Sequence, residues 1–149
     1  MNNLMLILVI CWGLTASCGN GTKKDGTAKV EQTQPQETKD HVEILYFHGK
    51  QRCSTCMAIE KHTQETIEEQ FANELKNGMV VFKTIDISKA ENEKIAQKYE
   101  VTWSSLFICK WKSGKETYEN LTGYAFANAR KNPEVFKSEI TNKVRTSLK

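Results

Sequence analysis

Two cysteines, Cys53 and Cys56, are separated by two residues, and they are the side chains of this sequence best suited to do chemistry. Such a pair can form a reversible disulfide, bind a soft metal ion through two thiolates, or make a disulfide that only supports the structure. Residues three positions apart share a face of a helix, so a helix would bring the two sulfur atoms within bonding distance. The elements around the pair therefore decide what it can do.

The pair lies between a predicted strand and a predicted helix. Residues 42–47 read VEILYF, an apolar run typical of a strand that is buried on both faces. From residue 53 to residue 76 apolar side chains recur every three or four positions, which predicts a helix with one buried face that ends at Asn77 and Gly78. Cys53 is therefore expected at the N-terminus of a helix, where free backbone N–H groups and the helix dipole stabilise a thiolate.

The side chains beside the pair suggest a role for each cysteine. Lys50 and Arg52 are expected to add positive charge near Cys53. We therefore expect Cys53 to be the attacking thiol, which forms a mixed disulfide with a substrate, and Cys56 to be the thiol that resolves it. His48 follows the strand and is expected either to carry protons, because the pKa of histidine lies near neutral pH, or to be a partly exposed loop residue.

Strands and helices alternate along the rest of the domain. Further strands are predicted at residues 79–87, 103–111 and 116–122, and helices at residues 89–100 (with Ser88 as N-cap) and from Pro133 onward, with a possible helical turn at 124–131. A tight turn at residues 112–115 joins the last two strands. The order β-α-β-α-β-β-α predicts an α/β fold with a four-stranded mixed sheet flanked by three or four helices.

A Cys-x-x-Cys motif at a strand-to-helix junction, followed by this order of elements, resembles the thioredoxin superfamily over residues 42–149. The local stretches YFHG, RCSTC and VTWSSL are similar to a bacterial group of small thioredoxin-like proteins. Some members of that group are labelled as a nitroreductase subunit linked to arsenic resistance, but no part of this chain reads as a flavin site. The resemblance implies thiol–disulfide exchange with protein thiols, protein disulfides or a dedicated redox partner, without a dissociable cofactor.

The chain departs from the thioredoxin pattern at two places. Thioredoxins have a cis-proline that faces the disulfide before the third strand, whereas the two prolines of this chain lie elsewhere. Ser104 is expected to take that place with a trans peptide bond, since a cis bond without proline costs about 3 kcal/mol. Trp103 beside it is expected either to contact substrate or to be buried. Thioredoxins also have a buried acid on the first strand, and ILYF contains none.

The missing proline opens a second interpretation, because in this superfamily that proline helps to keep metal ions away from the paired thiols. Cys53 and Cys56 could then bind or deliver a soft metal such as copper, with His48 or Met57 as a further ligand. A third interpretation is a binding module of the same fold that has no catalytic activity. Cys109, within the apolar stretch LFIC, is expected to be a buried free thiol.

The first forty residues predict export. Residues 4–12 form an apolar run that is too short to cross a bilayer and is typical of a secretory signal. Small residues then lead into Cys18, which resembles a bacterial lipoprotein signal. We therefore expect a signal peptide at 1–17, a lipidated Cys18 with a flexible linker at 18–40, and a thioredoxin-like domain at 41–149. The alternative is an ordinary signal, cleaved near Cys18, that releases a soluble exported protein.

The composition limits the possible partners and location. The net charge is +3 and no long block of like charges occurs, so no nucleic-acid partner is indicated. Removal of Cys11 with the signal and lipidation of Cys18 would leave one cysteine pair and one single cysteine in an oxidising compartment. We expect the domain to be lipid-anchored in the bacterial envelope, on the periplasmic face, and Gly19 favours the outer membrane over the inner one.

Overall fold

A computed structural model describes residues 39–149. The predictions of a signal peptide, of lipidation at Cys18 and of most of the linker lie outside the described residues. No helix within residues 39–149 is long and apolar enough to cross a membrane. The elements are β1 (His41–His48), α1 (Ser54–Gln70), α2 (Ala72–Lys76), β2 (Val80–Asp86), a 3-10 turn η1 (Ala90–Asn92), α3 (Glu93–Lys98), β3 (Ser105–Lys112), β4 (Lys115–Asn120), α4 (Thr122–Asn128) and α5 (Pro133–Ser147).

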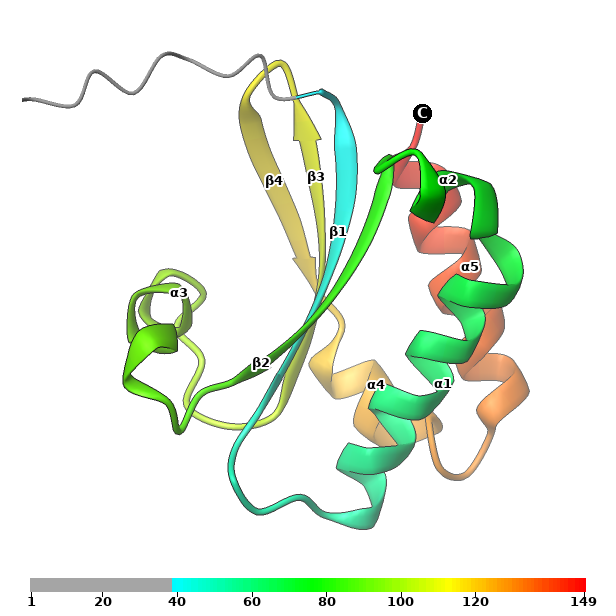
Figure 1. The fold of residues 1–149 in the computed structure, drawn as a ribbon. Coiled ribbons are helices and arrows are strands. Elements are labelled where there is room, and N and C mark those ends of the chain that lie inside the picture. The colour runs from blue at the N-terminus through cyan, green and yellow to red at the C-terminus, as the bar shows by residue number, and fades with distance from the viewer. Residues whose placement is uncertain (1–38) are drawn as a thin grey trace, which may run out of the picture. The chain divides into compact units, whose positions relative to one another are not determined.

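The four strands form one mixed sheet in the order β2-β1-β3-β4. β1 pairs with β2 in parallel, whereas β1 with β3 and β3 with β4 are antiparallel. Helices α1, α2, α4 and α5 lie on one side of the sheet and α3 lies on the other (Figure 1). This confirms the predicted fold class, a four-stranded mixed sheet of thioredoxin-like topology with flanking helices.

Several element boundaries differ from the predictions, and three of the differences concern a named residue. The long predicted helix is divided at Phe71, whose backbone leaves the helical conformation and whose side chain is buried. Ser88 does not cap α3, because its backbone N–H and its Oγ both donate to Oδ1 of Asp86, at 2.9 and 2.7 Å. Thr122 was expected in the last strand but begins α4, where its Oγ1 accepts the backbone N–H of Leu106 at 3.0 Å.

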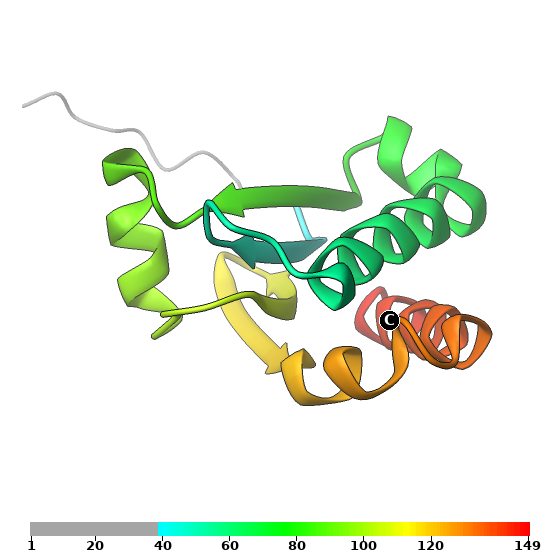
Figure 2. The same cartoon turned by 90° about the horizontal axis from the view of Figure 1, so that it is seen from below.

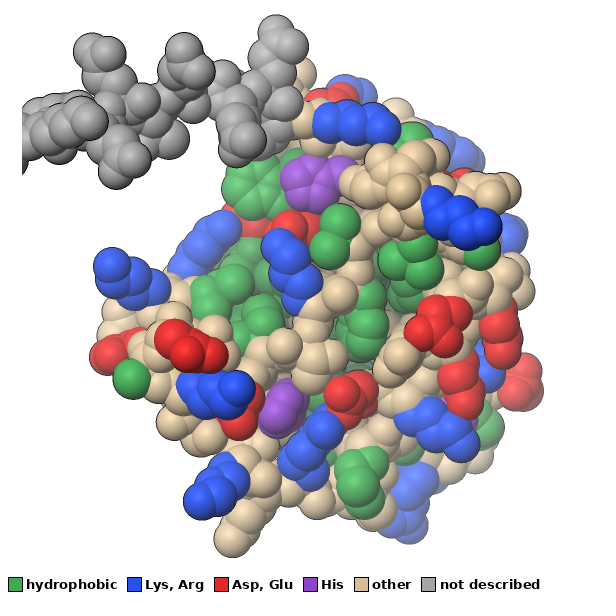
Figure 3. All heavy atoms as spheres, viewed as in Figure 1, with side chains coloured by type: hydrophobic (Ala, Val, Ile, Leu, Met, Phe, Trp, Pro, Cys, Tyr) green, Lys and Arg blue, Asp and Glu red, His purple; other side chains and the backbone are tan. Residues whose placement is uncertain are grey.

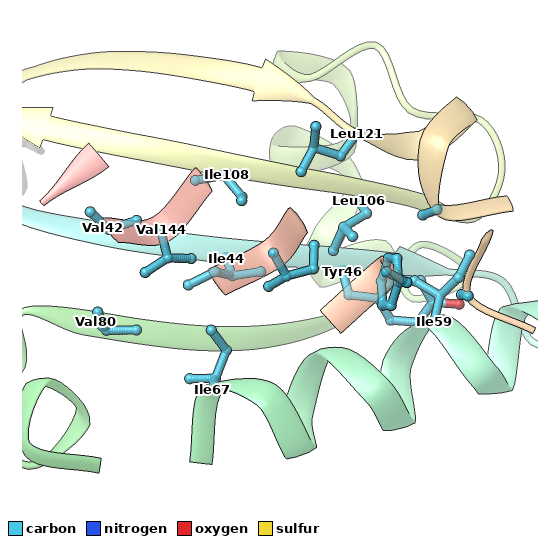
Figure 4. Packing of buried hydrophobic residues seen from close by; sticks show 14 of the residues in the cluster. Val42, Ile44, Tyr46, Ile59, Ile67, Val80, Leu106, Ile108, Leu121 and Val144 are labelled. Atoms are coloured by element: carbon cyan, nitrogen blue, oxygen red, sulfur yellow. The ribbon is translucent and has the colours of Figure 1, made fainter. Parts of the chain in front are cut away.

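β1 lies at the centre of the core, as its apolar sequence predicts. Its side chains alternate between the two faces of the sheet, so that Ile44 and Tyr46 pack toward α1 and α5 while Leu45 and Phe47 pack toward α3. Figure 4 shows the first of these clusters between the sheet and the helices. Because β1 is fixed by buried side chains on both faces, the connection that follows it starts from a rigid position.

The face that packs against α3 contains a polar network centred on Tyr99. The Tyr99 hydroxyl donates to the Glu116 carboxylate, which also forms an ion pair with Lys98, and the Cys109 thiol lies 3.4 Å from the Tyr99 oxygen. Burial, together with the Cys109 thiol and the Glu116 carboxylate, raises the pKa of Tyr99. Burial also raises the pKa of Cys109 to about 11, so that its thiol stays protonated at neutral pH. The expectation that Cys109 is a buried free thiol is confirmed.

An acid-sensitive contact joins α1 to α5. Glu65 accepts hydrogen bonds from Lys137, at 2.8 Å, and from His62, at 3.1 Å, and these contacts lower the pKa of Glu65 from 4.5 to about 2. A carboxylate whose pKa is lowered by folding contributes stability above its unfolded pKa and loses it as the pH falls. The contribution of Glu65 is therefore present above pH 4.5 and is lost between pH 4.5 and about 2.

Replacement of Glu65 by Gln is expected to remove this part of the pH dependence. The urea midpoint of the native chain should fall more steeply between pH 4.5 and pH 3 than that of Glu65→Gln, because only the native chain has this carboxylate to protonate. Glu74→Gln is the control, because Glu74 lies on α2 and makes no ion pair or side-chain hydrogen bond within residues 39–149. Parallel curves for the native chain and Glu65→Gln would contradict the assignment.

Candidate functional site

Cys53 and Cys56 are joined by a disulfide bond at the N-terminus of α1, with their Cα atoms 5.0 Å apart. Cys53 is the N-cap residue, and its Sγ accepts the backbone N–H of Cys56 at 3.0 Å. No acidic side chain lies in the first turn of α1. The positive end of the helix dipole and a backbone N–H group therefore act on the Cys53 sulfur, which is the environment that stabilises a thiolate after reduction.

The two sulfurs differ in their access to solvent. Cys53 is exposed, whereas only 6% of Cys56 is exposed. An external thiol or disulfide can therefore reach Cys53, while Cys56 can react only with a group already attached at Cys53. This asymmetry is the one that the roles of attacking and resolving thiol require.

Tyr46 supports the buried end of the pair. It projects from β1, is completely buried, and donates a hydrogen bond from its hydroxyl to the backbone carbonyl of Cys56 at 2.7 Å. In the close-up of the core it lies next to Ile59 of α1 (Figure 4). The first turns of α1 are thus held directly on the central strand by a buried hydrogen bond and by apolar packing.

Arg52 and Lys50, the two expected supporting charges, differ in whether a carboxylate pairs with them. Arg52 forms an ion pair with Glu60 of α1, and its guanidinium lies 5.7 Å from the centre of the Tyr46 ring. The charge of Arg52 is therefore compensated by a neighbouring carboxylate. Lys50 is exposed in the connection between β1 and α1, and within residues 39–149 it makes no ion pair or side-chain hydrogen bond.

His48 lies at the end of β1 and is partly exposed. Its Nδ1 is 2.9 Å from the carbonyl oxygen of Gly49, and its ring stacks on Tyr46 with 6.1 Å between the ring centres. Its Nε2 makes no hydrogen bond to a described residue. His48 is therefore close to the buried phenol beneath the disulfide, but no hydrogen bond joins it to either sulfur within the part of the chain that the structure describes.

The loop before β3 contains Ser104 and Trp103. Every peptide bond of residues 39–149 is trans, and Ser104 is buried. Trp103 is 57% exposed and packs on Phe126 of α4, with 5.0 Å between the ring centres. The alternative prediction, that Trp103 is buried in the core, is therefore wrong. Trp103 borders a shallow surface hollow that is also lined by Glu100, Val101, Ser105, Asn120, Thr122 and Gly123.

Sequence reasoning missed three side chains of the site, namely Tyr46, Glu60 and Arg130. Glu60 lies on α1, eight residues after Arg52, which precedes the helix, so no i,i+3 or i,i+4 spacing predicts their ion pair. Arg130 follows α4 and donates from Nη1 to the hydroxyl of Ser54, between the two cysteines, at 2.8 Å. Only the packing of α4 beside the N-terminus of α1 brings Arg130 there, and Figure 2 views this end of the domain.

The metal interpretation gives Cys53 and Cys56 a further ligand, His48 or Met57. Within residues 39–149, no group of three or more His, Cys, Asp or Glu side chains is arranged to hold a metal ion. His48 therefore does not join Cys53 and Cys56 in such a group. In the structure the two cysteine sulfurs are bonded to each other.

No family model and no curated protein sequence matches this chain significantly. Similar solved structures include a thioredoxin from Fasciola hepatica, with 22% identity over 68% of this chain and 80% of that one and a TM-score of 0.44. A thioredoxin from Thermus thermophilus has 17% identity over 68% and 72%, with a TM-score of 0.43. The reduced thioredoxin pre-protein of Schistosoma mansoni has 18% identity over 69% and 82%, with a TM-score of 0.43.

The topology of the chain itself defines its class. Strand order, the parallel β1–β2 pair, the antiparallel β3–β4 hairpin and the placement of the helices are those of a thioredoxin-like domain. The disulfide-bonded Cys-x-x-Cys pair lies at the N-terminus of α1, directly after the central strand. The described residues thus have a thioredoxin-like fold with a Cys-x-x-Cys disulfide.

Proposed function

We propose that the protein is a thiol–disulfide oxidoreductase that acts through Cys53 and Cys56. One observation carries this proposal: an exposed cysteine at a helix N-terminus is bonded to a buried cysteine one turn further on. A purely structural disulfide has no need of one accessible sulfur in a setting that stabilises a thiolate. The proposal extends to protein disulfides or a dedicated redox partner as substrate, and it does not include nitroreduction.

The reaction begins from the reduced pair when the domain acts as a reductant. The Cys53 thiolate attacks one sulfur of the substrate disulfide, the substrate S–S bond breaks, and its other sulfur leaves as a thiolate that takes a proton from water. The Cys56 thiol then loses its proton to solvent and attacks the Cys53 sulfur. This step forms the Cys53–Cys56 bond and releases the second substrate thiolate, so two electrons pass from the domain to the substrate. Oxidation of a substrate dithiol is the same sequence in reverse.

Substrate contacts are proposed for the exposed surface around the disulfide. Trp103 offers an exposed aromatic ring on a packed support, Phe126, and such rings contribute strongly to binding surfaces. His48, at the end of β1, is proposed to carry protons to and from this end of the domain. Lys50 adds an exposed positive charge to the connection between β1 and α1.

We also propose that the domain works in the bacterial cell envelope, attached to the periplasmic face of a membrane by lipid on Cys18. The support is the apolar run at residues 4–12 and the small residues that lead into Cys18. Labelled palmitate should enter the native chain and not Cys18→Ser. Equal labelling of the two chains would contradict the anchor.

Equilibration in glutathione and dithiothreitol buffers tests whether the disulfide is an exchanging couple. An oxidoreductase is expected to reach equilibrium at a potential between about −270 and −120 mV, the range of known exchange proteins. A structural disulfide is expected to stay oxidised down to below about −300 mV. A value in that lower range would contradict the proposed function. The fraction reduced is measured by alkylation and mass spectrometry of the peptides that contain Cys53 and Cys56, so that Cys11, Cys18 and Cys109 are not counted.

A further inference from the structure

The charge beside the disulfide differs between its two sides. The outward surface of α1 carries Glu60, Glu65 and Glu68 together with Lys61, and acidic side chains gather over this helix in Figure 3. On the other side, the turn after α4 carries Arg130 and Lys131, both exposed. Ion pairs with Arg52 and Lys137 compensate Glu60 and Glu65, so a substrate that reaches Cys53 meets mostly paired charges along α1 and, at the turn after α4, basic groups with no ion pair within residues 39–149.

Arg130 is the basic side chain that is tied to the reactive motif. Its Nη1 donates to the hydroxyl of Ser54, the residue that follows Cys53, at 2.8 Å. Within residues 39–149 no carboxylate forms an ion pair with Arg130, in contrast to Arg52, which is paired with Glu60. Because only Nη1 is used, the other N–H groups of the Arg130 guanidinium face no partner that the described residues supply.

The backbone that presents Arg130 is firmly held. The preceding residue, Ala129, is completely buried in the same cluster as Ile59 of α1. The backbone N–H of Ala129 donates to the carbonyl oxygen of Ala125 at 2.9 Å. The backbone N–H of Asn132 donates to the carbonyl oxygen of Asn128 at 2.7 Å. The position of Arg130 beside Ser54 is therefore set by core packing and by a hydrogen-bonded turn.

The charge of Arg130 lies beside the N-terminus of α1. A cation beside a helix N-terminus is unfavourable, because the helix dipole already places positive charge there. The first turn of α1 contains no acidic residue that would compensate it. Arg130 therefore adds positive charge next to Cys53 that no carboxylate of residues 39–149 compensates, and this charge favours an anion at that place, whether the Cys53 thiolate or a carboxylate of the substrate.

We infer that Arg130 determines specificity by favouring disulfides that carry a carboxylate next to the reacting cysteine, as in an acidic peptide. A guanidinium binds a carboxylate through two parallel hydrogen bonds, and the unused N–H groups of Arg130 are available for this contact. Ser54 holds the guanidinium beside Cys53 during the reaction. This inference rests on the proposed function, because it names the substrate class of the same Cys53–Cys56 site.

Two matched disulfide peptides test the inference. They differ only in having Glu or Lys next to the cysteine, and the rate at which each oxidises the reduced full chain is measured by stopped flow at low salt. The ratio of the Glu rate to the Lys rate is expected to fall about fivefold in Arg130→Met, the size typical of one exposed charge pair. Arg130→Lys should keep most of the ratio, and added salt should reduce it in the native chain.

Arg145→Met is the matched control. It removes the same charge, but Arg145 contacts Gln70 at the opposite end of α1, so the ratio should equal that of the native chain. An unchanged ratio in Arg130→Met, or an equal fall in Arg145→Met, would overturn the inference. These results leave the proposed function intact, because in this assay that function fails when the native chain exchanges with neither peptide faster than free dithiothreitol does.

Discussion

Replacement of Cys53 by Ser is expected to abolish disulfide exchange, whereas replacement of Cys56 by Ser is expected to stop it after the first step. In Cys53→Ser the remaining sulfur is buried and no external disulfide can reach it. In Cys56→Ser the exposed Cys53 thiolate still attacks, but nothing resolves the mixed disulfide. Turnover should fall to the uncatalysed rate in both variants, and stable mixed disulfides should accumulate only in Cys56→Ser.

Mass spectrometry of the reduced variants after incubation with a disulfide peptide distinguishes the two outcomes. The expected product is one peptide attached to Cys53 in Cys56→Ser and no peptide attached to Cys56 in Cys53→Ser, with the site of each adduct assigned after digestion so that Cys11 and Cys18 are counted separately. Cys109→Ser provides the control, because the buried Cys109 thiol has a pKa raised to about 11 and should not contribute. Equal adducts in both single variants would contradict the separate roles that we assign to the two cysteines.

Replacement of Tyr46 by Ala is expected to lower the free energy of unfolding by about 4 kcal/mol, the range for loss of a large buried aromatic side chain. Tyr46 is completely buried between β1 and α1, and its hydroxyl holds the Cys56 carbonyl. Tyr46→Phe keeps the ring and removes only that hydrogen bond, so a loss of about 1 kcal/mol is expected. Urea denaturation of the oxidised proteins measures both values.

Tyr118→Ala serves as the exposed control for Tyr46→Ala. Tyr118 is about half exposed on the edge strand β4, so its removal should cost much less than that of Tyr46. If the Tyr46→Ala and Tyr118→Ala variants had equal free energies of unfolding, Tyr46 would not support α1 as described. The proposed support also predicts that Tyr46→Phe alters the reactivity of Cys56 more than Tyr118→Ala does.

The fold was predictable from the sequence because its main signals are local. The apolar run of β1, the helical spacing after Cys53 and the turn before β4 each appear within a few consecutive residues. At that turn, Ser113 and Gly114 adopt the positive φ angles typical of a two-residue hairpin turn. The break at Phe71 was not predictable in this way, because it depends on the cavity that its side chain fills in the core.

The candidate site was predictable only where its residues are close in the sequence. The pairing distance of Cys53 and Cys56 follows from helical spacing, and the position of Cys53 at the N-cap follows from the preceding strand. The compensation of Arg52 by Glu60 and the approach of Arg130 to Ser54 depend on how α1 and α4 pack, which no short pattern encodes. The sequence therefore indicated the reactive sulfurs but not the cation that remains uncompensated beside them.

The central claim, that this domain catalyses thiol–disulfide exchange, is tested most directly by its turnover of a protein disulfide. Reduction of insulin by dithiothreitol is followed with and without the native chain, at equal total dithiol. We expect insulin to be reduced much faster with the native chain than with an equal concentration of free dithiol. The Cys53→Ser variant should give no such increase in rate. A native chain that reduces insulin no faster than the same amount of free dithiol would contradict the central claim.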